Sequence, residues 1–277
     1  MPAGGLAPRN RLAHMSMDAT SEPAPRRRRV GVIGVLGEVL LTGGALVLLF
    51  LGWQMWWNDA ITGAQQSAAA SDLSLDWQEQ ARAHGDGATD DLADEIVVED
   101  GMEPPPVDEG AHPYGEAFAV MYVPRFGADS QRTIAEGTGL DVLNSVDLGV
   151  GHYEGTQMPG AVGNFAIAAH RSAYGGGMHE IDRLRLGDGI FIQTADGWYT
   201  YRFRDLEYVT PDTVGVLAPV PHRPDLAPTD RIITLTSCNP LYSTAERIIA
   251  YGVLESWRPA SAGPPDEIAA AVAEWGR

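Results

Sequence analysis

The chain has 277 residues, a formal net charge of −18 and one cysteine. A single cysteine excludes an internal disulfide, so the thiol packs in the core, forms a disulfide to another chain or acts as a nucleophile. All 19 basic residues are arginines. Outside the N-terminal tail they form no basic patch of the kind that binds nucleic acid, so we expect no nucleic-acid partner.

An apolar segment near the N-terminus, residues 30–57, exceeds the roughly 20 residues that a helix needs to cross a bilayer. Arginines precede it at residues 26–29, and tryptophans cluster within residues 53–57. Arginines stay on the cytoplasmic side and indoles favour the membrane interface. The pattern predicts a single-pass signal anchor in the cell membrane, with a cytoplasmic basic tail, residues 1–29, and an extracellular remainder. A cleaved signal peptide is disfavoured, because its apolar region has only roughly 7–15 residues.

The next segment, residues 58–115, is rich in Ala, Ser, Gly, Pro and acids and contains a single base, Arg82. Low hydrophobicity with high net charge does not bury enough surface to fold. We therefore expect an acidic, disordered extracellular tether. The stretch EPPPVDEG, residues 103–110, predicts a stiffer polyproline end. A short helix with Trp77 on one face is expected within SLDWQEQARA, residues 74–83.

Residues 116–258 have the length of one ordinary domain. Short β-type segments recur through them, and in one of these Tyr199, Tyr201 and Phe203 alternate with polar residues, as in a half-buried strand. Turn-forming Gly, Pro and Asp separate the segments, and helical patterns are confined to about 139–145 and 178–184. Many short strands joined by turns predict a mainly β fold, a closed or nearly closed barrel. The expected strands are 117–124, 131–137, 163–170, 188–194, 198–209, 230–238 and 246–257.

The thiol of Cys238 lies at the end of its strand, directly before Asn-Pro. A cysteine that only packs in the core would be expected in the middle of a strand. Reactive groups tend to lie in loops on a rigid scaffold, and a nucleophilic cysteine needs a base or a cation beside it. His170 ends its own strand in the same way. Arg247 begins the strand after the cysteine, and an antiparallel neighbour would bring it back beside the thiol. Three polar groups at strand ends are the layout expected of a cysteine transpeptidase.

These residues lie in motifs that resemble the sortase signature: TLTSC followed by NP and AER, with AAHR and YG upstream. The anchor with GEVLLTGG and WQMWWND, and the block LGVGHYEGTQMPGAVGNFAIAAHR, are most similar to the class E sortases of actinobacteria. The resemblance covers the anchor and nearly all of residues 117–257. It does not cover the acidic tether or the C-terminal tail, residues 259–277. Ser237 occupies a position where many sortases carry threonine, and this difference does not affect the reaction.

The resemblance implies a closed eight-stranded barrel with short helices and a membrane-anchored cysteine transpeptidase. Cys238 would attack the Thr-Gly bond of a Leu-Ala-x-Thr-Gly or Leu-Pro-x-Thr-Gly sorting signal, the former being favoured in class E, and form a thioacyl enzyme. His170 would act as acid and then as base, and Arg247 would hold the substrate or the oxyanion.

The implied partners are secreted proteins with C-terminal sorting signals, a peptidoglycan precursor or cell-wall peptide amine, and the lipid around the anchor. No metal or cofactor is required, and the sequence has no metal-ligand spacing. His152 is placed either in a substrate groove or in loop packing. Five residues are candidates for contacts to the substrate: Tyr153, Tyr174, Thr236, Ser237 and Asn239.

Two other functions stay open. A pilin-polymerising sortase usually carries a second membrane segment at its C-terminus, and the tail DEIAAAVAEWGR contains no apolar span. A non-catalytic, surface-anchored β-barrel that binds a wall polymer or a protein would not need Cys238, His170 and Arg247 together.

Overall fold

The structure, a computed structural model, describes residues 31–85, 96–97, 105–108 and 110–275. The expected cytoplasmic tail and part of the expected tether lie outside these ranges. The chain divides into two units, Met1–Leu49 and Phe50–Arg277.

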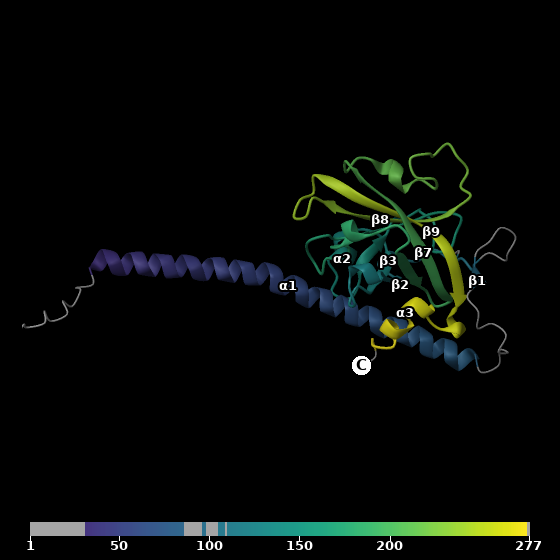
Figure 1. Ribbon diagram of the computed structural model, residues 1–277, viewed down its shortest axis with the longest axis horizontal. Helices are drawn as coiled ribbons and strands as arrows, with labels where there is room; N and C mark the ends of the chain where they lie inside the picture. Colours follow the sequence, from purple (N-terminus) through teal and green to yellow (C-terminus); the bar gives the residue numbers. More distant parts are fainter. Residues whose placement is uncertain (1–30, 86–95, 98–104, 109, 276–277) are drawn as a thin grey trace, which may run out of the picture. The chain divides into compact units, whose positions relative to one another are not determined.

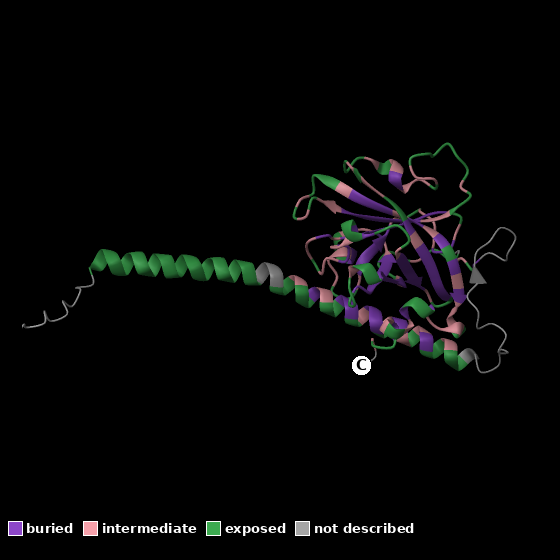
Figure 2. Ribbon diagram, viewed as in Figure 1, coloured by how far each residue is buried: buried purple, intermediate pink, exposed green. Residues whose placement is uncertain are grey.

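The described part of the first unit is helical. Helix α1 begins at Val32 and ends at Gly85 in the second unit (Figure 1). Residues 32–49 are exposed throughout (Figure 2). The most apolar 18-residue window of α1 has a mean hydropathy of 2.2 and is 0% buried. By length and composition, this helix is a candidate for a membrane span.

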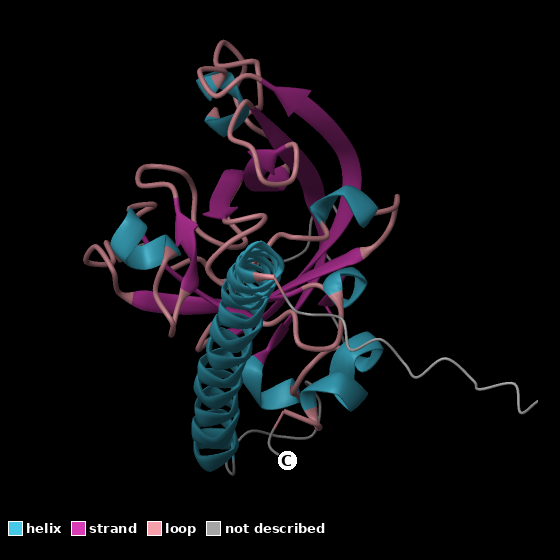
Figure 3. Cartoon of the chain, turned by 90° about the vertical axis from the view of Figure 1, so that its left-hand side faces the viewer, coloured by secondary structure: helices cyan, strands magenta, loops and turns pink. Residues whose placement is uncertain are grey.

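The second unit is built on a closed β-barrel, and the helices lie outside its strands (Figure 3). In the described part of the chain, the order around the barrel is β9-β7-β6-β2-β3-β4-β5-β8, and β8 pairs with β9 to close it. The pairs β3–β4 and β5–β8 are parallel, and the other barrel pairs are antiparallel. The strands are β2 (Ala117–Tyr122), β3 (Arg132–Glu136), β4 (Gly149–His152), β5 (Gly163–Ala169), β6 (Gly189–Gln193), β7 (Gly197–Val209), β8 (Arg231–Asn239) and β9 (Glu246–Pro259).

The mainly β, closed barrel expected from the sequence is confirmed with the eight strands that the resemblance implies, and the seven strands expected from the pattern are present. Strand β4 was missed, because four residues with two glycines carry neither alternation nor β propensity. Its pairing with β3 and β5 holds it in the sheet. The expected helical segments form α2 (Leu140–Leu143) and the 3₁₀ turn η3 (Ile181–Arg183). The described residues also contain the 3₁₀ turns η2 (Pro124–Phe126), η4 (Val214–Leu217) and η5 (Ala260–Ala262).

The barrel interior is filled by alternate strand residues, as the sequence pattern indicates. Tyr199, Tyr201 and Phe203 of β7 are buried in the main core, whereas Arg204 of the same strand is exposed. The buried Tyr201 hydroxyl accepts a hydrogen bond from the Gly160 amide at 2.8 Å, which satisfies its polar end.

The expected tether differs most from the structure. Residues 59–85 continue α1, and one face of this stretch is buried within the second unit (Figure 2). The buried positions recur every three or four residues, as one helix face requires, but they are polar or small: Thr62, Gln66, Ser67, Ala70, Ser71, Ser74 and Gln78. A hydrophobic pattern does not find such a face. Ser67 bonds to the Asp129 carbonyl, and Ser74 bonds to Gln193, so the barrel supplies partners for it.

Two later parts of the expected tether also contact the barrel. Strand β1 (Ile96–Val97) pairs with β9 beyond the start of β8, at the opposite edge from Cys238. Pro105 is buried, and the Pro106 carbonyl accepts a hydrogen bond from the Tyr199 hydroxyl at 2.7 Å.

The expected C-terminal tail contains helix α3 (Asp266–Val272), which packs on the outside of the barrel. Ile268 and Val272 are buried against Tyr122, Phe191 and Trp198. These three aromatic side chains belong to β2, β6 and β7, so α3 covers the outer face of neighbouring strands.

We predict that Ile268→Ala lowers the free energy of unfolding by about 2–5 kcal/mol, because it removes buried methylenes and leaves a cavity. Leu186→Ala, at a side chain that is 74% exposed, is the control and should change it by less than about 0.5 kcal/mol. Denaturant titration of the full chain in detergent measures both. Equal, small effects would show that α3 contributes nothing to stability.

Candidate active site

The thiol of Cys238 lies at the end of β8 and is partly buried. In the antiparallel pair of β8 and β9, Cys238 lies directly opposite Arg247. The register of these two strands therefore brings the arginine back to the level of the thiol, as expected.

His170 reaches the same edge of the barrel from the other side of β8. Strands β5 and β8 are parallel, and Ala168 pairs with Thr236. Two residues further along the chain in each case are His170, directly after β5, and Cys238, near the end of β8. Because parallel strands end at the same edge of a sheet, the imidazole and the thiol leave neighbouring strands at the same level. The structure thus brings Cys238, His170 and Arg247 to the ends of three adjacent strands.

Two neighbours hold the imidazole of His170. Its Nε2 lies 2.7 Å from Oδ1 of Asn144, which is the C-cap of α2, and donates to that oxygen. The ring of Tyr174 lies against it at 5.2 Å between centroids, tilted by 36°. An Nε2 donor leaves Nδ1 as the basic atom of the neutral ring.

Burial lowers the pKa of His170, because the imidazolium is less well solvated there than in water. The negative charge of Asp59 in α1 opposes this effect and raises the pKa. The helix that carries the apolar segment therefore contributes to the electrostatics of the histidine.

The guanidinium of Arg247 is anchored at one nitrogen. Its Nη1 donates to the carbonyls of Thr244 at 3.1 Å and Glu246 at 3.0 Å. Among the described residues, Nε and Nη2 have no hydrogen-bond partner. Together with the fixed plane of the guanidinium, these donors suit a carbonyl or an oxyanion held near the thiol.

The five candidate substrate contacts fall into two environments. Thr236 and Ser237 of β8 are buried. Their hydroxyls donate to carbonyls of the neighbouring strand β5, those of Ile167 at 3.2 Å and Ala169 at 2.8 Å. Tyr174 is 46% exposed. The Tyr153 hydroxyl bonds to Thr236 at 2.9 Å, and the amide of Asn239 bonds to Arg171 and, at 2.8 Å, to Glu246. Their contacts to a substrate stay a prediction.

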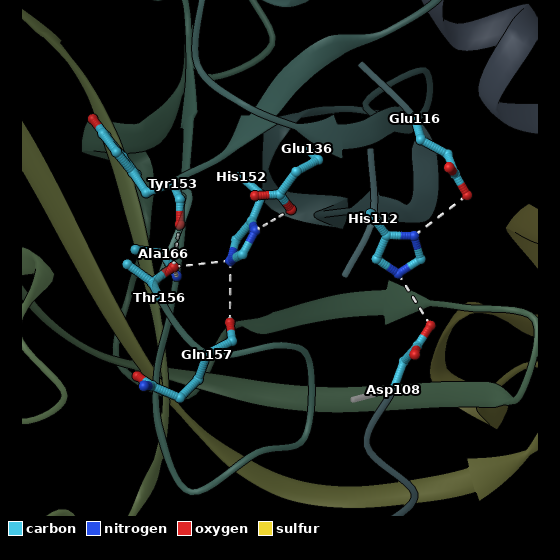
Figure 4. Close-up of polar contacts among 9 residues, drawn as sticks. All are labelled: Asp108, His112, Glu116, Glu136, His152, Tyr153, Thr156, Gln157 and Ala166. Atoms are coloured by element: carbon cyan, nitrogen blue, oxygen red, sulfur yellow. Dashed lines mark hydrogen bonds and ion pairs between the residues drawn. The ribbon is translucent and has the colours of Figure 1, made fainter. Parts of the chain in front are cut away.

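His152 belongs to loop packing (Figure 4). The ring is buried, with Nδ1 at 2.7 Å from Glu136 and Nε2 at 2.8 Å from Thr156 and 3.2 Å from the Gln157 carbonyl. The phenol of the neighbouring Tyr153 extends away from it. Every polar atom of the ring is engaged, so this histidine holds the β4–β5 loop.

Sequence reasoning missed Asn144 and Asp59. An asparagine at the end of a short helix and an aspartate after an apolar span are common, so neither carries a local signal. A cavity of about 870 Å³ lies between α1 and the loop that follows His170, lined among others by Asp59, Ser67 and Arg132. Cys238 and Arg247 do not line it. Among the described residues, no group of three or more His, Cys, Asp or Glu could hold a metal ion.

A nucleophile, an acid–base group and a forked donor at one edge of a barrel are the parts of an acyl-transfer site. Comparison with known proteins agrees with this class. The sortase domain model matches residues 121–255. Sortase SrtE1 of Streptomyces coelicolor is 33% identical over 261 residues, which are 91% of this chain and 66% of that protein.

Two solved structures are also similar. The SrtA sortase from Actinomyces oris is 41% identical with a TM-score of 0.55, over 60% of this chain and 93% of that one. Sortase E1 from Streptomyces coelicolor, solved with a tripeptide in the active site, is 36% identical with a TM-score of 0.51, over 57% of this chain and 99% of that one. The chain belongs to the sortase family, whose members are cysteine transpeptidases. Its similarity to the Streptomyces proteins supports class E.

We predict that Asp59→Asn lowers the pKa of His170 further. The substitution keeps an acceptor for the Gly175 amide, which Asp59 Oδ1 holds at 2.8 Å, but removes the negative charge that favours the imidazolium. A smaller fraction of His170 is then protonated at neutral pH. An NMR titration of the histidine ring measures this change. Asp72→Asn, at an exposed position further along α1, is the control. A pKa that is unchanged or higher in Asp59→Asn would contradict the prediction.

Proposed function

We propose that the protein is a membrane-anchored class E sortase, which cleaves the Thr-Gly bond of a Leu-Ala-x-Thr-Gly or Leu-Pro-x-Thr-Gly sorting signal and joins the threonine to a cell-wall peptide amine. The observation that carries the proposal is the register of β5, β8 and β9. It brings His170, directly after β5, and Arg247, at the start of β9, to the edge where β8 carries Cys238. Membership of the sortase family supplies the reaction class.

In the first half-reaction, the Cys238 thiolate attacks the threonine carbonyl carbon and forms a tetrahedral oxyanion. The free donors of Arg247 hold this oxyanion. The C–N bond to glycine then breaks, and His170 gives a proton to the departing amine. The product is a thioester between Cys238 and the threonine of the secreted protein.

In the second half-reaction, an amine of a peptidoglycan precursor attacks the thioester carbonyl. His170, now neutral, takes the proton from the attacking nitrogen, and the C–S bond breaks to release the Cys238 thiolate. A new amide joins the secreted protein to the cell wall. The lowered pKa of His170 suits its role as a base near neutral pH.

The proposed location follows from the N-terminal part of the chain. The exposed apolar stretch of α1 serves as a single membrane span, with the arginine-rich residues 26–29 on the cytoplasmic side. The barrel is then extracellular, where both secreted proteins and cell-wall amines are available. Tyr153, Tyr174 and Asn239 line the approach of the sorting signal, and Thr236 and Ser237 shape the strand beneath it.

We predict that the full chain in detergent cleaves a Leu-Ala-x-Thr-Gly peptide between Thr and Gly, and that Cys238→Ala abolishes cleavage. The substitution removes the nucleophile and one partly buried sulfur atom, so the melting temperature should change little. Mass spectrometry should find the threonine-ended fragment on Cys238 of the wild type. Cleavage by Cys238→Ala would refute the mechanism. Peptide binding that survives thiol blocking, without any cleavage, would favour a non-catalytic binding module.

We predict that Arg247→Lys lowers kcat by about 10²–10³, the range for loss of one oxyanion donor. Lysine keeps the positive charge but loses the planar fork of donors. Steady-state cleavage of the same peptide measures the effect, with Arg183→Lys as the control at an exposed arginine. Activity of Arg247→Lys within a few-fold of the wild type would mean that only the charge matters.

A further inference from the structure

The side chain of Gln66 in α1 connects two loops of the barrel. Its Nε2 donates to the carbonyl of Ser145 at 2.7 Å and to the carbonyl of Tyr174 at 3.0 Å. The residue is completely buried. Both protons of one amide group are therefore committed to two backbone segments that are far apart in sequence.

These two segments are the ones that hold His170. Ser145 directly follows Asn144, whose Oδ1 accepts the hydrogen bond from His170 Nε2. Tyr174 carries the ring that lies against the imidazole. In the described part of the chain no hydrogen bond joins Gln66 to His170, but Gln66 connects the backbones of both segments whose side chains contact the ring.

The barrel leaves room for this amide by means of two glycines. Gly149 and Gly175 both have positive φ, +98° and +85°, which favours glycine. A Cβ at Gly149 would lie 2.7 Å from the Gln66 side chain, and one at Gly175 would lie within van der Waals overlap of Gln66 Oε1. Only residues without a side chain allow the glutamine to enter between the two loops. Asp59, two turns earlier in α1, accepts from the Gly175 amide at 2.8 Å and secures the same loop.

We propose that Gln66 is a positioning residue for the acid–base step: from the helix that follows the apolar segment, it holds the Asn144 and Tyr174 loops so that the His170 ring faces the thiol. The inference rests on the function proposed above. It makes residues 59–71 of α1 a part of the catalytic support. A chain that lacks them would keep the three reacting groups but lose the contacts that align the imidazole.

The test compares Gln66→Met with Gln78→Met in the full chain in detergent. Gln78 is the matched control: it is buried on the same helix, 5% exposed, and its amide donates only to Ser74, one turn earlier. Both variants replace a buried amide by an apolar side chain of similar length. Only Gln66→Met releases the two loops beside His170.

We expect Gln66→Met to lower kcat for peptide cleavage by roughly 10- to 100-fold with little change in KM, since a small misplacement of a catalytic group costs up to about 10² in rate. The NMR signals of the His170 ring should shift in Gln66→Met and stay unchanged in Gln78→Met. If Gln66→Met does not fold, Gln66→Asn, which keeps the amide but shortens its reach, should show the same shift and loss of kcat.

Unchanged His170 signals and unchanged kcat in a folded Gln66 variant would overturn the proposal. Equal losses in the Gln66 and Gln78 variants would also overturn it, because they would reflect general destabilisation. If the wild type cleaves no sorting peptide, the proposed function fails, but the His170 signals still decide whether Gln66 positions the ring.

Discussion

The arrangement of the candidate site depends on the pairing of β8 with a parallel neighbour on one side and an antiparallel neighbour on the other. The parallel partner, β5, ends at the same edge as β8, and the antiparallel partner, β9, begins there. Side chains reinforce the parallel pair: Thr234 donates to the buried Asn164 at 2.6 Å, and Thr236 and Ser237 donate to backbone carbonyls of β5. A slip of one residue would turn each side chain to the opposite face, so these bonds also keep Cys238 level with His170.

The second unit uses a polar interface where a hydrophobic one is usual. The buried face of α1 consists of Ser, Thr, Gln and Ala, and its Gln66, Ser67 and Ser74 bond to the barrel. Buried polar groups destabilise a protein unless they are paired, and paired groups specify a single arrangement. Small side chains also let the helix approach the barrel closely. The helix thereby acquires a fixed position beside the loop after His170.

The electrostatics of the site follow from this packing. Burial by the surrounding loops favours the neutral form of His170, and the nearby Asp59 favours the charged form. In the proposed mechanism His170 gives a proton and later takes one, and such a group works best when neither form is strongly favoured. The net charge of −18 has little part in this balance, because exposed charges further away than about 10 Å are screened by salt. Burial, the larger influence, and the opposing charge of Asp59 in α1 set it locally.

The sequence alone determined the class of fold and the candidate reacting residues. Alternating segments and turn residues predicted seven of the eight barrel strands, and the strand-end positions of Cys238, His170 and Arg247 marked them as candidates. The tertiary structure decided what has no local pattern. Strand β4 forms because its neighbours supply hydrogen bonds. Helix α1 continues past the apolar segment because the barrel provides hydrogen-bond partners for its polar face. Helix α3 packs on the barrel because three strands present aromatic side chains to it. Asn144 and Asp59 come close to His170, and Gln66 to the loops beside it, only in the folded chain. A buried polar contact depends on a partner distant in sequence, whereas a hydrophobic period can be read from consecutive residues.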